Sequence, residues 1–167
     1  IGMYRDGLWL LRNSATLGNA NIEVRFGEAG WQPIVGDWNG DGIDNVGVYR
    51  DGQFMLNMNG TVQMFTFDPL GQGGTPIAGD WDGINGDTVG LYNAGVWALA
   101  DSNMANASAN VFSYGEPTWL PVVGDWNENG IDTIGGYRNG RWYLRNHNNA
   151  GASDVAFAFA GVGVPLT

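Results

Sequence analysis

Residues 36–54 read GDWNGDGIDNVGVYRDGQF, and two landmarks within this segment recur along the chain. Its Gly-Asp-Trp landmark is found at 36–38, 79–81 and 124–126. Its tyrosine recurs at offsets of 45, 43 and 45 residues, at Tyr4, Tyr49, Tyr92 and Tyr137. Two landmarks that recur with matching offsets identify an internal repeat of about 44 residues.

A hairpin pattern surrounds each of these tyrosines. A two-residue turn signal follows each tyrosine segment, and such dipeptides are typical of tight β-hairpins. The four turns are Asp6-Gly7, Asp51-Gly52, Ala94-Gly95 and Asn139-Gly140. After each turn, an aromatic residue and a leucine alternate at period two, which predicts a strand with one buried face. The pairs are Trp9 and Leu11, Phe54 and Leu56, Trp97 and Leu99, and Trp142 and Leu144.

Each repeat contains two further strand-like segments. A third strand is predicted after a polar loop, over Ile22–Phe26, Val62–Phe67, Asn110–Tyr114 and Val155–Phe159. A fourth is predicted just before the acidic segment, over Pro33–Val35, Pro76–Ala78, Pro121–Val123 and Val164–Leu166. Four short antiparallel strands in about 44 residues match the size of a propeller blade.

The sequence therefore predicts one all-β domain over 1–167, a β-propeller of four four-stranded blades. The repeat units are approximately 1–35, 36–78, 79–123 and 124–167. The chain starts with a tyrosine strand and ends with a fourth strand, so we expect the N- and C-terminal strands to pair and close the ring. Two alternatives stay open: an eight-bladed ring made by two chains, and a fragment of a longer propeller. We accordingly expect a monomer or a homodimer.

The charge balance excludes several classes of partner. The chain has 17 Asp and Glu against 7 Arg and a net charge of -10, which repels phosphate backbones and anionic membranes. We therefore expect no nucleic-acid binding. No apolar run approaches the roughly 18 residues of a membrane span, so we expect no membrane insertion either. The absence of cysteine excludes disulfides. Without a signal peptide or initiator Met, the chain is expected to be a mature or excised domain.

The acidic segments follow a calcium-loop pattern, and we name them junction one (37–45), junction two (80–88) and junction three (125–133). In junction one, Asp37, Asn39 and Asp41 occupy positions 1, 3 and 5. Gly42 at position 6 permits a sharp turn, after which the carbonyl of Ile43 is a natural ligand. Hard cations such as Ca²⁺ require several such oxygens around one point. The pattern matches the first half of an EF-hand loop but has no Glu at position 12 and no flanking helices.

The other two junctions depart from this pattern. Junction three has Asn129 at position 5, and the lost charge predicts weaker affinity. Junction two offers Asp80 and Asp82 but has an isoleucine at position 5. Position 8 is acidic in all three junctions, and this side chain either completes the coordination shell or caps the turn through backbone N–H groups. The position-8 residues are Asp44, Asp87 and Asp132. The competing interpretation is that Asp, Asn and Gly serve only to form tight turns.

At these residues the chain resembles the FG-GAP/VCBS repeats of bacterial integrin-α-like β-propellers. The match is complete over 36–42, and the similarity covers the whole chain as four units. The resemblance implies a Ca²⁺ cofactor and a secreted or cell-surface location. It also implies the ligands Asp37, Asn39, Asp41 and the Ile43 carbonyl, and then Asp125, Asn127, Asn129 and the Ile131 carbonyl. The family has its last acidic ligand at position 9, where this chain has Asn45, Thr88 or Thr133, and it commonly has about seven blades.

The eight tryptophans fall into three positional classes. Trp9, Trp97 and Trp142 repeat with strand periodicity, which predicts packing between blades. The tryptophans of the Gly-Asp-Trp landmarks are expected to pack beneath the junctions. Trp31 and Trp119 lie in equivalent loops of only two units, and we expect them to be exposed and available for ligand contact.

These features favour a non-catalytic, calcium-binding module for extracellular binding, adhesion or scaffolding, with a protein or glycan partner. The alternative is a lectin-like carbohydrate-binding module, and a third possibility is a purely structural spacer. We do not expect an enzyme, because the single histidine, His147, lies in a polar run and no nucleophile–base arrangement is present.

Overall fold

A computed structural model describes residues 1–84 and 86–159. Fifteen strands form four antiparallel sheets there. The first sheet comprises β1 (Gly2–Arg5), β2 (Leu8–Leu11) and β3 (Ile22–Arg25). The second comprises β4 (Gln32–Gly36), β5 (Asn45–Arg50), β6 (Gln53–Met58) and β7 (Thr61–Thr66). The third comprises β8 (Thr75–Gly79), β9 (Thr88–Asn93), β10 (Val96–Ala100) and β11 (Ala109–Ser113). The fourth comprises β12 (Leu120–Gly124), β13 (Thr133–Arg138), β14 (Arg141–Leu144) and β15 (Val155–Ala158).

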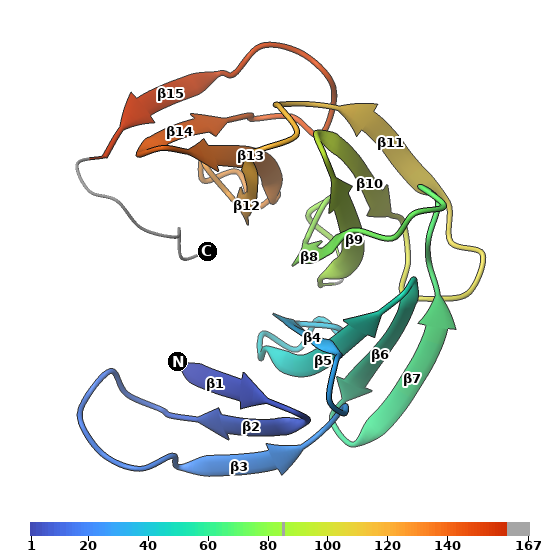
Figure 1. Cartoon of the computed structure of the whole chain (residues 1–167), viewed down its shortest axis with the longest axis vertical. Coiled ribbons are helices and arrows are strands. Elements are labelled where there is room, and N and C mark those ends of the chain that lie inside the picture. The colour runs from blue at the N-terminus through green and yellow to red at the C-terminus, as the bar shows by residue number, and fades with distance from the viewer. Residues whose placement is uncertain (85, 160–167) are drawn as a thin grey trace.

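The four sheets stand as blades around a common centre, which confirms the predicted four-bladed, all-β propeller (Figure 1). Strands β4, β8 and β12 are innermost, and β8 contacts both of the others. Strands β3, β7, β11 and β15 form the rim (Figure 1). The described residues form no helix capable of crossing a bilayer.

The blades are displaced by one strand from the repeat units. Strand β4 ends the first unit, but it pairs with β5 of the second, and β8 and β12 likewise pair with the tyrosine strands that follow them. Each junction therefore connects the two innermost strands of one blade. The strand predicted at 164–166, and with it the closure of the ring, lies outside the described residues.

The four predicted hairpin turns are confirmed by their backbone angles. Asp6, Asp51, Ala94 and Asn139 all have φ near +50°, and each following glycine has a φ of at least +80°. Positive φ at both central residues gives the type I′ turn, whose twist matches that of the flanking strands. Three of the four first residues are Asp or Asn, which tolerate this conformation; Ala94 is the exception.

Replacing Ala94 with asparagine is expected to stabilise the fold. Ala94 is exposed at a φ of 50°, a conformation that alanine adopts at a cost of about 1 kcal/mol and asparagine adopts more readily. We expect Ala94→Asn to raise the melting temperature by about 2–4 °C. The matched control is Asn139→Ala at a φ of 50°, which should lower it by a similar amount. A lower melting temperature for Ala94→Asn would refute this explanation.

The hydrophobic core lies between successive blades. Phe54 and Leu56 on β6 are fully buried and share one cluster with Val89 and Leu91 on β9 of the next blade. The two faces of β10 contribute to different clusters. Ala98 and Ala100 belong to the cluster just described, and Trp97 and Leu99 belong to the next one. The alternating side chains of one strand thus pack against the blades on both sides of it. Trp9 and Trp97 are buried as predicted.

Candidate metal centre

Junction one folds its acidic side chains into a single tight turn. The Asp37 carboxylate accepts the N–H of Asp41 at 3.0 Å with one oxygen and that of Gly42 at 2.7 Å with the other. Gly40 and Gly42 have φ values of 71° and 81°, which glycine adopts without strain. The Asp37 carboxylate at position 1 is thereby held against the backbone of positions 5 and 6.

The Asp41 carboxylate lies at the centre of the amide groups around junction one. It accepts Asn39 Nδ2 at 3.0 Å, Asn59 Nδ2 at 2.7 Å and the N–H of Ile43 at 2.9 Å. The Asn39 amide makes the largest contribution to holding the pKa of Asp41 below its usual value, with the Ile43 N–H and Asn59 contributing further. A carboxylate in this setting stays ionised and available to a cation.

Junction three repeats the arrangement of junction one. The Asp125 carboxylate accepts the N–H of Asn129 at 3.1 Å and that of Gly130 at 2.7 Å. The Gly130 N–H is the main cause of the lowered pKa of Asp125. Asn129 Oδ1 accepts the N–H of Ile131 at 2.9 Å, which is the bond that Asp41 makes to Ile43. The two junctions differ in charge at position 5 and at position 4, where junction three has Glu128 and junction one has Gly40.

Junction two forms a shorter turn. Asp80 Oδ1 accepts the N–H groups of Gly83 at 2.8 Å and Ile84 at 3.0 Å, three and four residues further on. Asp82 Oδ1 accepts the same Ile84 N–H at 2.9 Å. The isoleucine at position 5 supplies no side-chain oxygen, so this junction offers one candidate ligand fewer than the others.

The position-8 carboxylates of junctions two and three bond to backbone N–H groups, and the groups they cap belong to the preceding junction. Asp87 Oδ2 accepts the N–H of Asp37 at 2.9 Å, and Asp132 Oδ2 accepts that of Asp80 at 3.1 Å. Burial raises the pKa of Asp87 to about 6, and the charges of Asp132, Asp44 and Asp37 add to this effect. Burial also raises the pKa of Asp132. Asp44, by contrast, is exposed.

Position 9 has a structural role in two junctions. The Thr88 hydroxyl donates to the carbonyl of Ala100 at 2.8 Å, and the Thr133 hydroxyl lies 2.8 Å from the carbonyl of Arg145. Thr88 thus bonds to the end of β10, and Thr133 bonds to the residue that follows β14, in each case within the same blade. In junction one, Asn45 Nδ2 instead donates to the Ile43 carbonyl at 3.0 Å.

The tryptophan at position 2 packs beneath each junction, as predicted. Trp38 is 4% exposed, and a Cβ added to Gly36 would lie 2.7 Å from its ring. The rings of Trp81 and Trp126 lie against Gly79 and Gly124 in the same way. The glycine of the Gly-Asp-Trp landmark is therefore required because the following ring lies on its backbone.

The donor atoms of junctions one and three suit a hard cation. The side chains at positions 1, 3 and 5 supply carboxylate and amide oxygens, which are the ligands that Ca²⁺ takes in proteins. In the part of the chain that the structure describes, no three Asp, Glu, His or Cys side chains gather as a metal-binding group. A metal in these junctions would therefore rely on amide and carbonyl oxygens beside one or two carboxylates.

The expectation that Trp31 is exposed is wrong. Its side chain is 8% exposed and forms a cluster with Trp9 and Val48 between the first two blades. The Arg50 guanidinium lies 4.6 Å from the ring centroid and covers it. Trp31 is therefore part of the interface between blades, and its ring is not free to contact a ligand.

Trp119 is also packed rather than presented to solvent. Its ring stacks on Tyr143 at 4.4 Å and meets Tyr114 edge-on at 5.8 Å. A Cβ added to Gly136 would overlap the Trp119 ring. The other units have Met3, Val48 and Leu91 at the position of Gly136, so the glycine makes room for the Trp119 ring in this unit alone.

Sequence reasoning missed three asparagines that hold the junctions. Asn103 Nδ2 donates to the Asp87 carbonyl at 2.8 Å, and Asn148 Nδ2 donates to the Asp132 carbonyl at 2.9 Å. Asn59 contacts Asp41 as described above. Asn103 and Asn148 are 45 residues apart, which equals the offset of Tyr92 and Tyr137, so the repeat itself could have revealed them.

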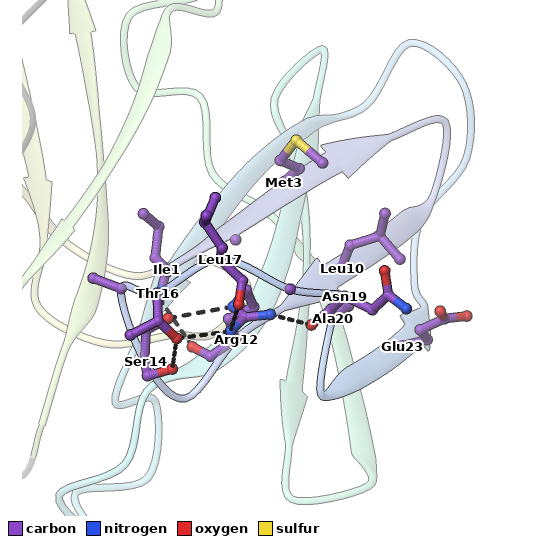
Figure 2. Close-up of a pocket in the computed structure, with 13 residues that line it drawn as sticks. Ile1, Met3, Leu10, Arg12, Ser14, Thr16, Leu17, Asn19, Ala20 and Glu23 are labelled. Atoms are coloured by element: carbon purple, nitrogen blue, oxygen red, sulfur yellow. Dashed lines mark hydrogen bonds between the residues drawn. The ribbon is translucent and has the colours of Figure 1, made fainter.

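A cavity of about 780 Å³ lies in the first blade, between β1, β2 and the loop that follows β2 (Figure 2). Ile1, Met3 and Leu17 form its apolar part and are largely exposed. The Arg12 guanidinium donates to Thr16 Oγ1 at 3.0 Å, to the Leu17 carbonyl at 3.2 Å and to the Asn19 carbonyl (Figure 2). Arg12 thus organises its own loop.

No family model, curated protein or solved structure matches the chain.

Proposed function

We propose that this chain is a non-catalytic, calcium-binding β-propeller that serves as an extracellular module for binding, adhesion or scaffolding. The observation that carries the proposal is the grouping of Asp37, Asn39 and Asp41 in one turn, together with its repetition in junction three. The resemblance of residues 36–42 to FG-GAP/VCBS calcium loops supports the same assignment.

Junction one is proposed as the principal calcium site, held by Asp37, Asn39, Asp41 and the Ile43 carbonyl. Junction three is proposed as a weaker site, with Asp125, Asn127, Asn129 and the Ile131 carbonyl. When bound, Ca²⁺ supplies positive charge that offsets the repulsion among carboxylates at the centre of an acidic protein. The chain's own part is to fix the turns: backbone N–H groups orient Asp37 and Asp125, and Asn59 holds Asp41.

Calorimetric titration of the full chain with CaCl₂ tests this proposal directly. We expect at least one calcium to bind, with magnesium binding more weakly because Mg²⁺ requires near-ideal octahedral geometry and loses its water reluctantly. The measurement should be repeated on Asp37→Ala, which removes the position-1 ligand of junction one. Absence of binding by the unmodified chain would refute the calcium assignment.

A carbohydrate-binding function is the second candidate, and a different surface supports it. A cavity of about 690 Å³, lined by both polar and apolar side chains, lies between junction two and the loop after β10. Its lining includes Trp81, Asp82, Asp101 and Asn110. Carboxylates and amides beside an aromatic ring provide the hydrogen-bonding groups and the apolar surface that a sugar requires.

Glycan-array binding by the full chain tests this second function. We expect binding to be lost in Asp82→Ala and Asp101→Ala, whose side chains are exposed in the cavity, and to be retained in Asp51→Ala on a hairpin turn outside it. Equal glycan binding by all three variants would exclude this cavity as the sugar site.

A further inference from the structure

Successive junctions are joined across the blade interface by paired hydrogen bonds. Asp37 donates its N–H to Asp87 Oδ2 at 2.9 Å, and Asp87 donates its own N–H to the Asp37 carbonyl at 2.8 Å. Asp80 and Asp132 repeat the arrangement at 3.1 and 2.8 Å. The residue at position 8 thus engages both backbone groups of the residue at position 1 in the preceding blade.

Close packing accompanies these bonds. A Cβ added to Gly86 would lie 2.7 Å from the Gly40 nitrogen, and the φ of Gly86 is +88°. Only glycine fits there, because both the space and the backbone conformation exclude a side chain. Gly83 approaches junction three in a similar way, since a Cβ added to it would lie 3.3 Å from the Gly130 carbonyl oxygen. Junction two is therefore in close contact with junction one, and junction three is in close contact with junction two.

We infer that Asp87 and Asp132 are positioning residues that act on the preceding junction, and not ligands of their own. Each fixes the backbone of the aspartate at position 1, whose carboxylate then forms the turn of its junction. In junction one, that turn carries the side chains of positions 3 and 5. Asp87 is therefore required for the site in junction one, although it belongs to the next blade. The metal part of this inference rests on the proposed calcium function.

Amide hydrogen exchange in the metal-free full chain tests the positioning role without calcium. We expect Asp87→Ala to accelerate exchange of the Asp37 amide by about tenfold or more and to leave the Asp80 amide unchanged. Asp132→Ala should accelerate exchange of the Asp80 amide and leave the Asp37 amide unchanged. Asp87→Asn keeps an acceptor oxygen and should preserve protection, and Asp44→Ala is the matched control because Asp44 is exposed.

Unchanged protection of the Asp37 amide in Asp87→Ala, or equal acceleration of both amides, would overturn the inference. If Asp87→Ala does not fold, the Asp132→Ala variant decides the question at the Asp80 amide. The contact it removes has the same form as the one between Asp87 and Asp37.

Calcium titration provides the second arm of the test. We expect Asp87→Ala to weaken binding at junction one by about tenfold, whereas Asp44→Ala changes it less than about threefold. The opposite result, with binding lost in Asp44→Ala and retained in Asp87→Ala, would show that position 8 is a ligand of its own junction. If the unmodified chain binds no calcium, the proposed function fails, while the exchange experiment still decides the positioning role.

Discussion

Trp38→Ala is expected to destabilise the propeller by about 3–5 kcal/mol, which is a large part of the stability of a typical domain. The ring is 4% exposed and belongs to the cluster formed by Leu56 and Val89 between the second and third blades. A Cβ on Gly47 would lie 3.2 Å from the ring, so the backbone packs closely against it. Removing the ring would leave a cavity directly beneath junction one.

Denaturant unfolding of Trp38→Ala measures this loss, and Leu17→Ala is the matched control. Leu17 is fully exposed, so the same kind of truncation there should change stability by less than about 0.5 kcal/mol. Equal effects at the two positions would contradict the buried role of Trp38. Because the ring joins the junction to the core, we also expect Trp38→Ala to weaken calcium binding.

Exchanging the position-5 residues of junctions one and three is expected to shift their calcium affinities in opposite directions. Asp41 and Asn129 each accept the N–H of the isoleucine two residues further on at 2.9 Å, so either residue supports the turn. Both are exposed, and the exchange leaves the core intact. The difference between them is one negative charge among the proposed ligands, and the charge of a ligand set tunes calcium affinity.

Asp41→Asn should weaken calcium binding on the order of tenfold, and Asn129→Asp should strengthen it by a similar factor. Titration calorimetry on the two single variants measures both changes. Asn127→Asp at position 3 of junction three provides a control for added charge at a neighbouring ligand position. If neither affinity responds to the exchange, the side chains at position 5 do not bind the metal.

The fold could be predicted from the sequence because its signals are local and repeated. The offsets of Tyr4, Tyr49, Tyr92 and Tyr137 fix the blade length, and the positive φ values of the hairpin residues confirm the turns. The predicted strands agree with the observed ones to within about one residue, as for Val62–Phe67 against β7 at Thr61–Thr66. Hairpins connect neighbours in sequence, so within the described sheets no distant strand pairing had to be inferred.

The exposure of the loop tryptophans could not be predicted in the same way. Whether Trp31 and Trp119 fold inward depends on Arg50 and Gly136, which lie on strands of the following hairpin. The role of Asp87 was similarly hidden, because its partner Asp37 is 50 residues away in another blade. Repeat analysis aligns equivalent residues but does not show which residues of neighbouring repeats meet.

A thermal melt of the full chain, in calcium and in chelator, shows whether the junctions bind calcium. In calcium at about 100 times the dissociation constant, stability should rise by about 2.7 kcal/mol over the chelated protein. For a chain of this size, that corresponds to an increase in melting temperature of about 5–10 °C. We expect excess chelator to lower the melting temperature and added calcium to restore it. An identical melting temperature in chelator and in calcium would show that the junctions do not bind calcium.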